Sequence, residues 1–419
     1  MTLSAGAEAG GRLNKFGLVA TAIALLAGQA LAQDSSQGWV TAWGASQQGL
    51  GEASISNATV RMTARVTIPG DSIRIRLDNT FGTAPVIFGN GRVGPRIQGP
   101  AVAATLNKPV TFNGKNSVTI PAGGSVRSDA VAFHVEAQQD LAVSLFVSGA
   151  NVAPSQHGNA VVTSYLTAND AGDQTSSEDG KPFTAKTTAM FWLKSIDVRP
   201  AMPATAIVAF GDSITDGTCT TLDAHDRWED VVAQRLALMS PVSRSVVNEG
   251  IGGNTVTGAH LVPKANSPPG LERLERDVLS HSGVSHVVLF MGTNDIRREV
   301  GADELITGMR EISTRLKAKG LKVIGATIIP RHNVAPVPDN TGWNDAKTKI
   351  RNQVNDWIRT KAGFDGVLDF DKIVRSPTNA DLINPPYNCG DGIHASPIGS
   401  FQMGKSVDLR LFLGRKEVN

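Results

Sequence analysis

The chain has 419 residues, of which 41% are apolar and 19% charged, with a formal net charge of +2 at pH 7. This length exceeds that of one ordinary domain, so we expect two domains that each bury a core. The near-neutral charge, with no basic stripe in the sequence, argues against nucleic acid or an anionic membrane as the main partner.

Residues 1–32 are typical of a secretory signal peptide. Arg12 and Lys15 supply a positive start, and residues 16–28 form a short apolar run. The Ala-Leu-Ala segment at 30–32 matches the small-residue cleavage rule. A membrane anchor needs about 20 apolar residues, more than this run contains, and we find no second candidate span. We therefore expect a secreted or periplasmic protein without a stable membrane span.

Residues 38–198 follow a period of two, which is typical of β-strands. Apolar and polar residues alternate over 60–68, Pro69-Gly70-Asp71 turns the chain, and residues 73–77 alternate again. We expect these two runs to pair as a hairpin with one buried face. Further strands are expected at 117–120, 130–135, 141–147, 161–166 and 189–198. Short strands at this spacing favour an antiparallel β-sandwich or jelly-roll domain over residues 38–198.

The pattern changes at residues 199–204, where Pro200 and Pro203 indicate a stiff linker. From 205 to 415, apolar runs typical of strands buried on both faces alternate with helical segments. This order predicts a three-layer, doubly wound α/β domain of flavodoxin-like type, with a parallel sheet. The expected strands are 206–210, 243–247, 286–290, 322–329 and 367–370.

Helices are expected between these strands. One is expected to begin at Asp226, because Glu229 follows at the spacing of a capping box. Apolar residues recur at helical spacing over 305–316 and again over 350–358. This periodicity predicts two further helices, each with one buried stripe.

Polar clusters end three of the predicted parallel strands. Residues 211–214 (Gly-Asp-Ser-Ile) follow the first strand, the glycine-rich segment 248–254 the second, and residues 292–295 (Gly-Thr-Asn-Asp) the third. A fourth cluster, 391–394 (Asp-Gly-Ile-His), places an acid and an imidazole three residues apart. The carboxyl ends of parallel strands lie side by side, so the fold brings these groups together. A serine hydrolase needs this set of nucleophile, base, orienting acid and oxyanion donors.

In this order the four segments resemble blocks I, II, III and V of the SGNH/GDSL hydrolases. The resemblance covers residues 205–412 and implies that Ser213 is the nucleophile, that His394 is the base and that Asp391 orients it. Ile214 replaces the usual leucine. The G-x-S-x-G elbow of the α/β-hydrolases is absent around Ser213.

The resemblance also implies an oxyanion hole. Its donors would be the N–H groups of Ser213 and Gly253 and the side-chain amide of Asn294. Residues 38–198 resemble the β-sandwich extension that a subset of secreted SGNH esterases carries. That second likeness depends on the strand pattern, on Trp39 and Trp43, and on the stretch Asp78-Asn79-Thr80-Phe81-Gly82.

Candidate substrate contacts are Asn254, Arg331 and His332. The alternative for the Arg331–His332 pair is that it only lines a loop after its strand. Asp212 and Asp295 are expected to be structural, bonding the backbone of their turns. The six histidines other than His332 and His394 show no metal-ligand spacing, and we expect them on the surface or in a satisfied core. They are His134, His157, His225, His260, His281 and His286.

The chain has two cysteines, Cys219 and Cys389, close in sequence to Ser213 and His394. Because catalysis brings Ser213 and His394 together, the loops that carry the cysteines must leave the same edge of the sheet. Export to an oxidising compartment favours a disulfide between them. Two separate buried thiols are the alternative.

We expect a serine esterase that hydrolyses carboxylic esters of a small molecule or a polysaccharide, without a metal or organic cofactor. The first alternative is a polysaccharide deacetylase of the acetylxylan type. Others are a carbohydrate-binding protein with an inactive hydrolase domain and a flavodoxin-like cofactor binder, which a visible chromophore would reveal. The complete set of site residues argues against an inactive domain. No oligomeric state is predicted.

Overall fold

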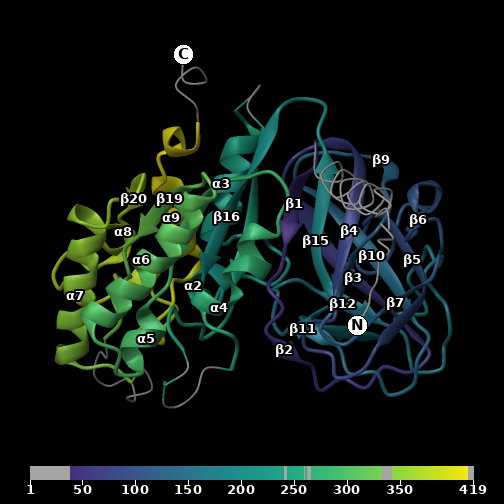
Figure 1. Cartoon of the computed structure of the whole chain (residues 1–419), viewed down its shortest axis with the longest axis horizontal. Coiled ribbons are helices and arrows are strands. Elements are labelled where there is room, and N and C mark those ends of the chain that lie inside the picture. Colours follow the sequence, from purple (N-terminus) through teal and green to yellow (C-terminus); the bar gives the residue numbers. More distant parts are fainter. Residues whose placement is uncertain (1–37, 240–242, 259, 262–265, 333–341, 414–419) are drawn as a thin grey trace, which may run out of the picture. The chain divides into compact units, whose positions relative to one another are not determined.

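The computed structural model describes residues 38–239, 243–258, 260–261, 266–332 and 342–413. The predicted signal peptide, residues 1–32, lies outside these ranges. The described residues from Trp39 onward form one compact unit, in which an antiparallel β region precedes an α/β region (Figure 1). Within the described ranges, no helix combines the length and apolar character that crossing a membrane requires.

The β region contains three antiparallel sheets. The first has the order β1 (Val40–Gly44), β15 (Leu193–Arg199), β4 (Gly70–Asp78) and β8 (Ser125–Arg127), and β9 (Val131–Val135) also pairs with β4. The second has the order β13 (Ala185–Thr187), β12 (Ser164–Leu166), β3 (Ala58–Val66), β10 (Gln139–Val147), β5 (Val86–Pro95) and β6 (Lys108–Pro109), and β7 (Val118–Ile120) pairs with β5. The third is formed by β14 (Met190–Phe191), β11 (Ser155–His157) and β2 (Gly49–Leu50). Apolar side chains of the two larger sheets share one core, as a sandwich requires.

The predicted hairpin between residues 60–68 and 73–77 is wrong. β3 pairs with β10 and β12, whereas β4 pairs with β15, β8 and β9. The chain therefore passes from one sheet to another at the turn. The polar side of β3 is also buried, since Arg61 is 1% exposed. Its Nη2 donates to the carbonyl oxygen of Ser177 at 2.7 Å. Alternation identified the face of each strand but not its partner strand.

The predicted parallel sheet of the α/β region is confirmed. Its order is β17 (Ser243–Gly250), β16 (Ala204–Gly211), β18 (Val284–Phe290), β19 (Lys322–Ala326) and β20 (Gly366–Leu368). The helices are α2 (Ser213–Asp216), α3 (Trp228–Ala237), α4 (Gly270–Leu274), α5 (Thr293–Arg297), α6 (Ala302–Ala318), α7 (Asp345–Thr360), α8 (Phe370–Val374) and α9 (Pro397–Ser406). A π-helical turn, Glu275–Leu279, continues α4.

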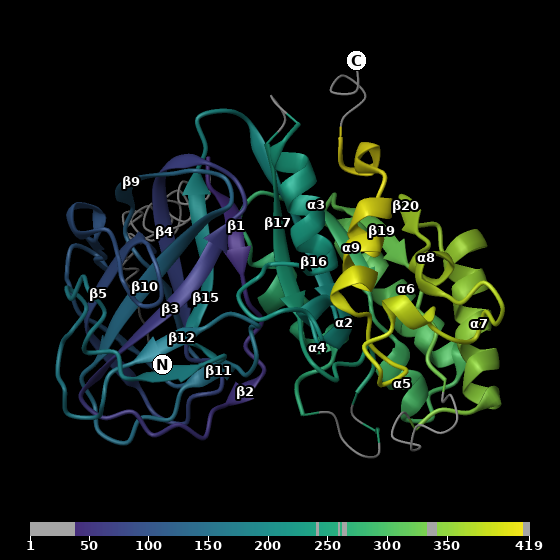
Figure 2. The ribbon, with the colours of Figure 1, turned by 180° about the vertical axis from the view of Figure 1, so that it is seen from behind.

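Helices cover both faces of the parallel sheet (Figure 1, Figure 2). On β16, Val208 and Phe210 share a core with apolar residues of α6 and α7, whereas Ile207 and Ala209 share a core with residues of α3 and α9. The sheet is thus the middle of three layers, which leaves the ends of its strands free to carry the site.

Helix α3 begins two residues later than predicted. Its N-cap is Arg227, and the side chain of Asp230 accepts the Arg227 backbone N–H at 3.2 Å. Glu229 is buried and hydrogen-bonds Asn248 of β17 instead of capping the helix. The expected capping box of Asp226 and Glu229 is therefore wrong, because the Glu229 side chain hydrogen-bonds a strand of the sheet.

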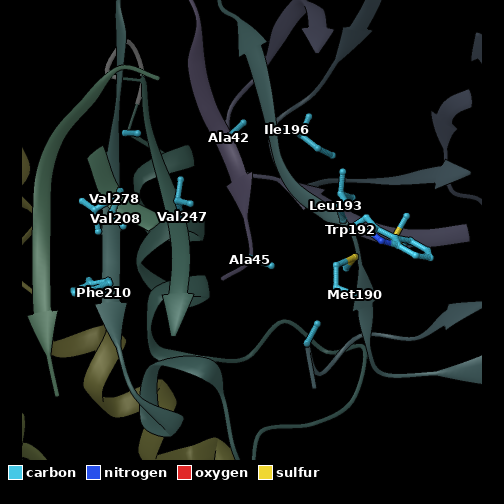
Figure 3. Close-up of a cluster of buried hydrophobic side chains, with 14 of the residues drawn as sticks. Ala42, Ala45, Met190, Trp192, Leu193, Ile196, Val208, Phe210, Val247 and Val278 are labelled. Atoms are coloured by element: carbon cyan, nitrogen blue, oxygen red, sulfur yellow. The ribbon is translucent and has the colours of Figure 1, made fainter. Parts of the chain in front are cut away.

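One apolar core continues from the β region into the α/β region. Figure 3 shows Ala42 of β1 and Ala45, which follows β1, in this core, together with Leu193 of β15 and Val247 of β17. Hydrogen bonds cross the same boundary, as Thr41 N–H donates to the carbonyl oxygen of Ser282 at 3.0 Å. β15 ends at Arg199 and β16 begins at Ala204; the division into domains 38–198 and 205–415 with linker 199–204 stays a prediction.

Candidate active site

Three side chains from the first and last motifs form a hydrogen-bonded row. Ser213 begins α2 directly after β16, and its Oγ lies 2.8 Å from Nε2 of His394. Nδ1 of His394 lies 2.6 Å from Oδ2 of Asp391. The other oxygen of Asp391 accepts the backbone N–H groups of Ile393 at 2.8 Å and His394 at 2.9 Å. The Asp391–His394 loop therefore orients its own imidazole toward Ser213.

The charge of Asp391 determines which nitrogen of the ring holds the proton. Burial raises the pKa of Asp391, but the hydrogen bonds from the ring and backbone of His394 outweigh this effect and lower the pKa to about 2. The carboxylate is therefore ionised at neutral pH and accepts a hydrogen bond from the Nδ1–H group of His394. In the neutral ring this leaves the Nε2 lone pair facing the Ser213 hydroxyl, as a general base requires.

The three candidate oxyanion donors lie at the ends of β16, β17 and β18. In the described part of the chain, the backbone N–H groups of Ser213 and Gly253 donate to no acceptor. Gly253 has a φ of 72°, a region that favours glycine. The buried Asn294 side chain donates one amide hydrogen to the carbonyl oxygen of Asn254 at 3.1 Å. Its second amide hydrogen has no acceptor among the described residues.

Two carboxylates beside these donors hold the backbone, as the sequence suggested. Asp212 accepts the Ile214 N–H at 3.0 Å and thereby caps α2, and burial raises its pKa to about 7. Asp295 accepts the N–H groups of Val256 and Thr257, both at 2.9 Å, and burial raises its pKa to about 6. Asp295 therefore ties the segment after β17 to the segment after β18.

The suggested substrate contact at Asn254 does not fit the structure. Asn254 has no exposed surface. Its amide donates to Ser267 Oγ at 2.9 Å and to the carbonyl oxygen of Pro268 at 2.8 Å, while its oxygen accepts from Arg273 Nε at 3.0 Å. Every hydrogen-bonding atom of the side chain is engaged in the protein, so we assign Asn254 a structural role.

Arg331 and His332 lie at different depths. Arg331 is buried, its Nη1 lies 3.4 Å from Oγ1 of Thr293, and burial lowers its pKa to about 10. The charges of Asp212 and Asp391 act on the guanidinium in the opposite direction, so Arg331 adds positive charge near the row of Asp391, His394 and Ser213. Nε2 of His332 instead lies 2.9 Å from Oδ1 of Asp345, at the start of α7.

The predicted disulfide between Cys219 and Cys389 is formed, with 6.1 Å between the two Cα atoms. Cys389 N–H also donates to the carbonyl oxygen of His394 at 3.0 Å. The bridge thus joins the segment after α2 to the loop that carries the imidazole.

Among the described residues, Cys219, Asp391 and His394 form the one cluster spaced to hold a metal ion. The sulfur is bonded to Cys389 and the ring is bonded on both nitrogens, so this cluster does not supply three free ligands.

Sequence reasoning missed the residues that hold the glycine-rich turn after β17. Asp216, at the end of α2, accepts the Gly252 N–H at 2.8 Å. Arg273 of α4 donates to the carbonyl oxygens of Glu249 and Gly211, both at 2.9 Å. The position of Asp216, one helical turn after Ser213, was a usable signal. No signal in the sequence pointed to Arg273, because the residues that it contacts lie far away in the sequence.

Part of the chain is similar to known proteins. Residues 209–400 match the model of the GDSL-like Lipase/Acylhydrolase family, and no protein of curated function matches the sequence significantly. The aryl esterase of M. smegmatis is 20% identical, over 48% of this chain and 95% of that one, with a TM-score of 0.38. The lipase/acylhydrolase of Enterococcus faecalis is 23% identical, over 48% and 92%, with a TM-score of 0.37. A carbohydrate acetylesterase family member from Sinorhizobium meliloti is 19% identical, over 48% and 94%, with a TM-score of 0.39. Residues 209–400 are therefore identified as a GDSL-like lipase/acylhydrolase domain.

Proposed function

We propose that this protein is a serine esterase that hydrolyses carboxylic esters through an acyl-enzyme intermediate. The observation that carries the proposal is the hydrogen-bonded row from Asp391 through His394 to Ser213. It ends beside two backbone N–H groups, those of Ser213 and Gly253, that have no acceptor among the described residues. A nucleophile with its base, beside donors for a developing negative charge, is the arrangement that acyl transfer needs.

In the first half of the reaction, Ser213 Oγ attacks the ester carbonyl carbon while Nε2 of His394 takes the hydroxyl proton. The carbonyl oxygen gains the negative charge, which the N–H groups of Ser213 and Gly253 and the amide of Asn294 stabilise. The bond to the alcohol then breaks, and His394 returns the proton to the leaving oxygen. Asp391 stays ionised and stabilises the imidazolium throughout.

In the second half, water attacks the acyl-enzyme and His394 takes one of its protons. The second tetrahedral intermediate uses the same donors. When it collapses, Ser213 recovers its proton from His394 and the carboxylic acid leaves. These steps require only residues of this chain and water. The same oxyanion donors serve both halves of the reaction, because the negative charge develops on the same carbonyl oxygen in each half.

We also propose that the protein acts outside the cytoplasm. The signal-peptide pattern of residues 1–32 supports export. The disulfide between Cys219 and Cys389 is compatible with an oxidising compartment. The substrate would then be an extracellular or periplasmic ester of a small molecule or a polysaccharide.

Hydrolysis of p-nitrophenyl esters of increasing acyl length, assayed beside acetylated xylan, tests this function. Wild type should release p-nitrophenol, and Ser213→Ala and His394→Ala should each lower kcat by at least about 10³-fold. The exposed residues Ser148 and His134 supply matched control variants, Ser148→Ala and His134→Ala, which should keep wild-type rates. Wild-type activity in a folded Ser213→Ala or His394→Ala variant would refute the mechanism. Release of acetate from xylan without p-nitrophenyl ester cleavage would favour the deacetylase instead.

A further inference from the structure

A buried histidine of the β region reaches the α/β region close to the nucleophile. His157, at the end of β11, is 3% exposed. Its Nδ1 lies 2.8 Å from the carbonyl oxygen of Ser46. Its Nε2 lies 2.9 Å from Oδ1 of Asp216 and 3.1 Å from the carbonyl oxygen of Asn159. Asp216 ends the short helix that Ser213 begins.

The partners of this ring determine its protonation. Two are carbonyl oxygens and the third is a carboxylate, so both ring nitrogens face acceptors and both must donate. Burial lowers the pKa of His157, but the charge and hydrogen bond of Asp216 and the carbonyl groups of Ser46 and Asn159 outweigh it, and the net shift is upward. His157 is therefore an imidazolium that forms a buried ion pair with Asp216.

The second oxygen of Asp216 is bonded to the glycine-rich turn. Oδ2 accepts the N–H of Gly252 at 2.8 Å, and Gly252 directly precedes Gly253, the proposed oxyanion donor. The close packing of α2 on β17 leaves no space for a Cβ atom at Gly250. Asp216 thus holds the peptide next to the donor, and His157 holds Asp216.

Ser46 of the β region makes a second contact with residues that support the active site. The residue whose carbonyl oxygen binds His157 is Ser46, and its hydroxyl accepts from Nη1 of Arg273 at 2.9 Å. Arg273 also donates from Nη2 to the carbonyl oxygen of Gly211, two residues before Ser213, at 2.9 Å. The segment around Ser46 therefore contacts residues that support both the nucleophile and the oxyanion turn.

We propose that His157 is a positioning residue for ester hydrolysis, fixing Asp216 so that the Gly252–Gly253 peptide presents its N–H to the oxyanion. This inference rests on the proposed function. His157 acts only through Asp216 and Gly252, so it contacts neither substrate nor the reacting atoms. The β region then supplies part of the support for catalysis.

The size of the expected effect follows from what replaces the ring. His157 and Asp216 line a cavity of about 40 Å³, large enough for water to enter when the imidazole is removed. Water can donate to Asp216 but carries no positive charge. Removal of the His157 ring should therefore lower kcat by less than the roughly 10²–10³-fold effect of deleting an oxyanion donor outright. We expect a decrease in kcat of about 10- to 100-fold, with KM changed by less than about two-fold.

Two variants and two controls test this role. His157→Ala removes both donor nitrogens, and His157→Gln retains one donor nitrogen and should recover part of the lost kcat. His134→Ala removes an exposed histidine of the same region. His225→Asn replaces a buried histidine that lines the same cavity, and asparagine tolerates its φ of 51°. Both controls should keep the wild-type kcat.

The measurements are kcat and KM for p-nitrophenyl acetate, the inhibition constant of phenylboronic acid, and the melting temperature. Phenylboronic acid forms a tetrahedral adduct on a nucleophilic serine, so its binding reports on the oxyanion donors. Its inhibition constant should rise in His157→Ala by the same factor as kcat falls, and recover partly in His157→Gln. A purely structural role would lower the melting temperature while leaving kcat and boronate binding at wild-type values, which would overturn the proposal.

The wild-type protein separates failure of this inference from failure of the proposed function. If wild type neither cleaves p-nitrophenyl acetate nor binds phenylboronic acid, the proposed function is overturned and this inference with it. If wild type does both and the folded His157 variants match it, only the role of His157 is overturned. If His157→Ala does not fold, the same comparison is made with His157→Gln, which keeps the size and one donor.

Discussion

Lys194 of β15 and Glu249 of β17 form an ion pair with 2.6 Å between Nζ and Oε2, and neither side chain has exposed surface. Oδ1 of Asp277 lies 3.0 Å from the same ammonium group, and Nε2 of His281 lies 2.6 Å from the other oxygen of Glu249. Burial raises the pKa of Glu249, but the charges of Lys194 and His281 outweigh it and lower the pKa. The β region thus contributes a cation to a carboxylate that directly precedes the glycine-rich turn of the site.

Removal of this cation should cost much of the stability of the protein. Lys194→Met leaves Glu249 and Asp277 buried without their ammonium partner, which we expect to lower the free energy of unfolding by about 3–5 kcal/mol. Lys181→Met is the matched control, because Lys181 pairs with Asp179 at the surface, where water screens the pair and its contribution to stability is small. Urea denaturation measures both. Equal, small losses in the two variants would show that the buried pair is not needed for stability.

Asn294 is assigned to the transition state and not to substrate binding. Asn294→Ala removes the amide hydrogen that is left for the oxyanion, so kcat should fall by about 10²–10³-fold while KM stays nearly constant. Asn352→Ala, on an exposed position of α7, is the control and should not affect either constant. Steady-state kinetics with p-nitrophenyl acetate distinguish the outcomes. A large rise in KM at unchanged kcat would make Asn294 a binding residue.

The disulfide should support activity as well as stability. Reduction of Cys219–Cys389 frees the loop of His394 from the segment after α2, so activity should decline before the protein unfolds. Loss of the bridge should also cost about 2–4 kcal/mol of stability. Activity and circular dichroism are followed together during titration with a reductant, and the double variant Cys219→Ala/Cys389→Ala serves as the unbridged reference. Two reactive thiols in the denatured, unreduced protein would contradict the bridge.

The buried carboxyl group of Asp212 should make stability depend on pH. Its pKa is raised to about 7, whereas an aspartate in an unfolded chain titrates near about 3.9. Between these values the native protein keeps a proton that the unfolded chain has released, so the contribution of Asp212 to stability falls as the pH rises. Asp212→Asn removes this titration and keeps an oxygen to accept the Ile214 N–H.

Urea denaturation at several pH values between 4 and 7 tests this linkage. The stability of Asp212→Asn relative to wild type should increase as the pH rises, by about 3 kcal/mol over this range. Asp345→Asn, at an exposed carboxylate, is the control and should follow the wild-type curve closely. A constant difference between Asp212→Asn and wild type across the range would mean that Asp212 is ionised throughout.

The α/β region could be predicted from the sequence because its signals are local. Strands buried on both faces leave continuous apolar runs, as in Ala204–Gly211. Ser213 and Asn294 follow their strands directly, so the topology of a parallel sheet brings them together. Cys219 and Cys389 could be paired for the same reason, since each lies close in sequence to a residue of the Ser213–His394 contact.

The β region and the supporting residues could not be predicted in the same way. Alternation in β3 and β4 shows which side chains share a face, but pairing between distant strands leaves no mark on either sequence. His157 and Lys194 look like polar strand residues that face water. Their partners Asp216 and Glu249 lie 59 and 55 residues away, and only the folded chain shows that the polar face is buried against another region.

Covalent labelling with a fluorophosphonate, followed by mass spectrometry of the peptides, tests the assignment of Ser213 as nucleophile most directly. Wild type should take up one label, on the peptide that contains Ser213, in parallel with loss of p-nitrophenyl acetate hydrolysis. His394→Ala should be labelled far more slowly, because its serine hydroxyl lacks the base. Ser213→Ala should take up no label. A label on another residue that abolishes activity, or full inactivation of wild type with Ser213 unmodified, would contradict this assignment.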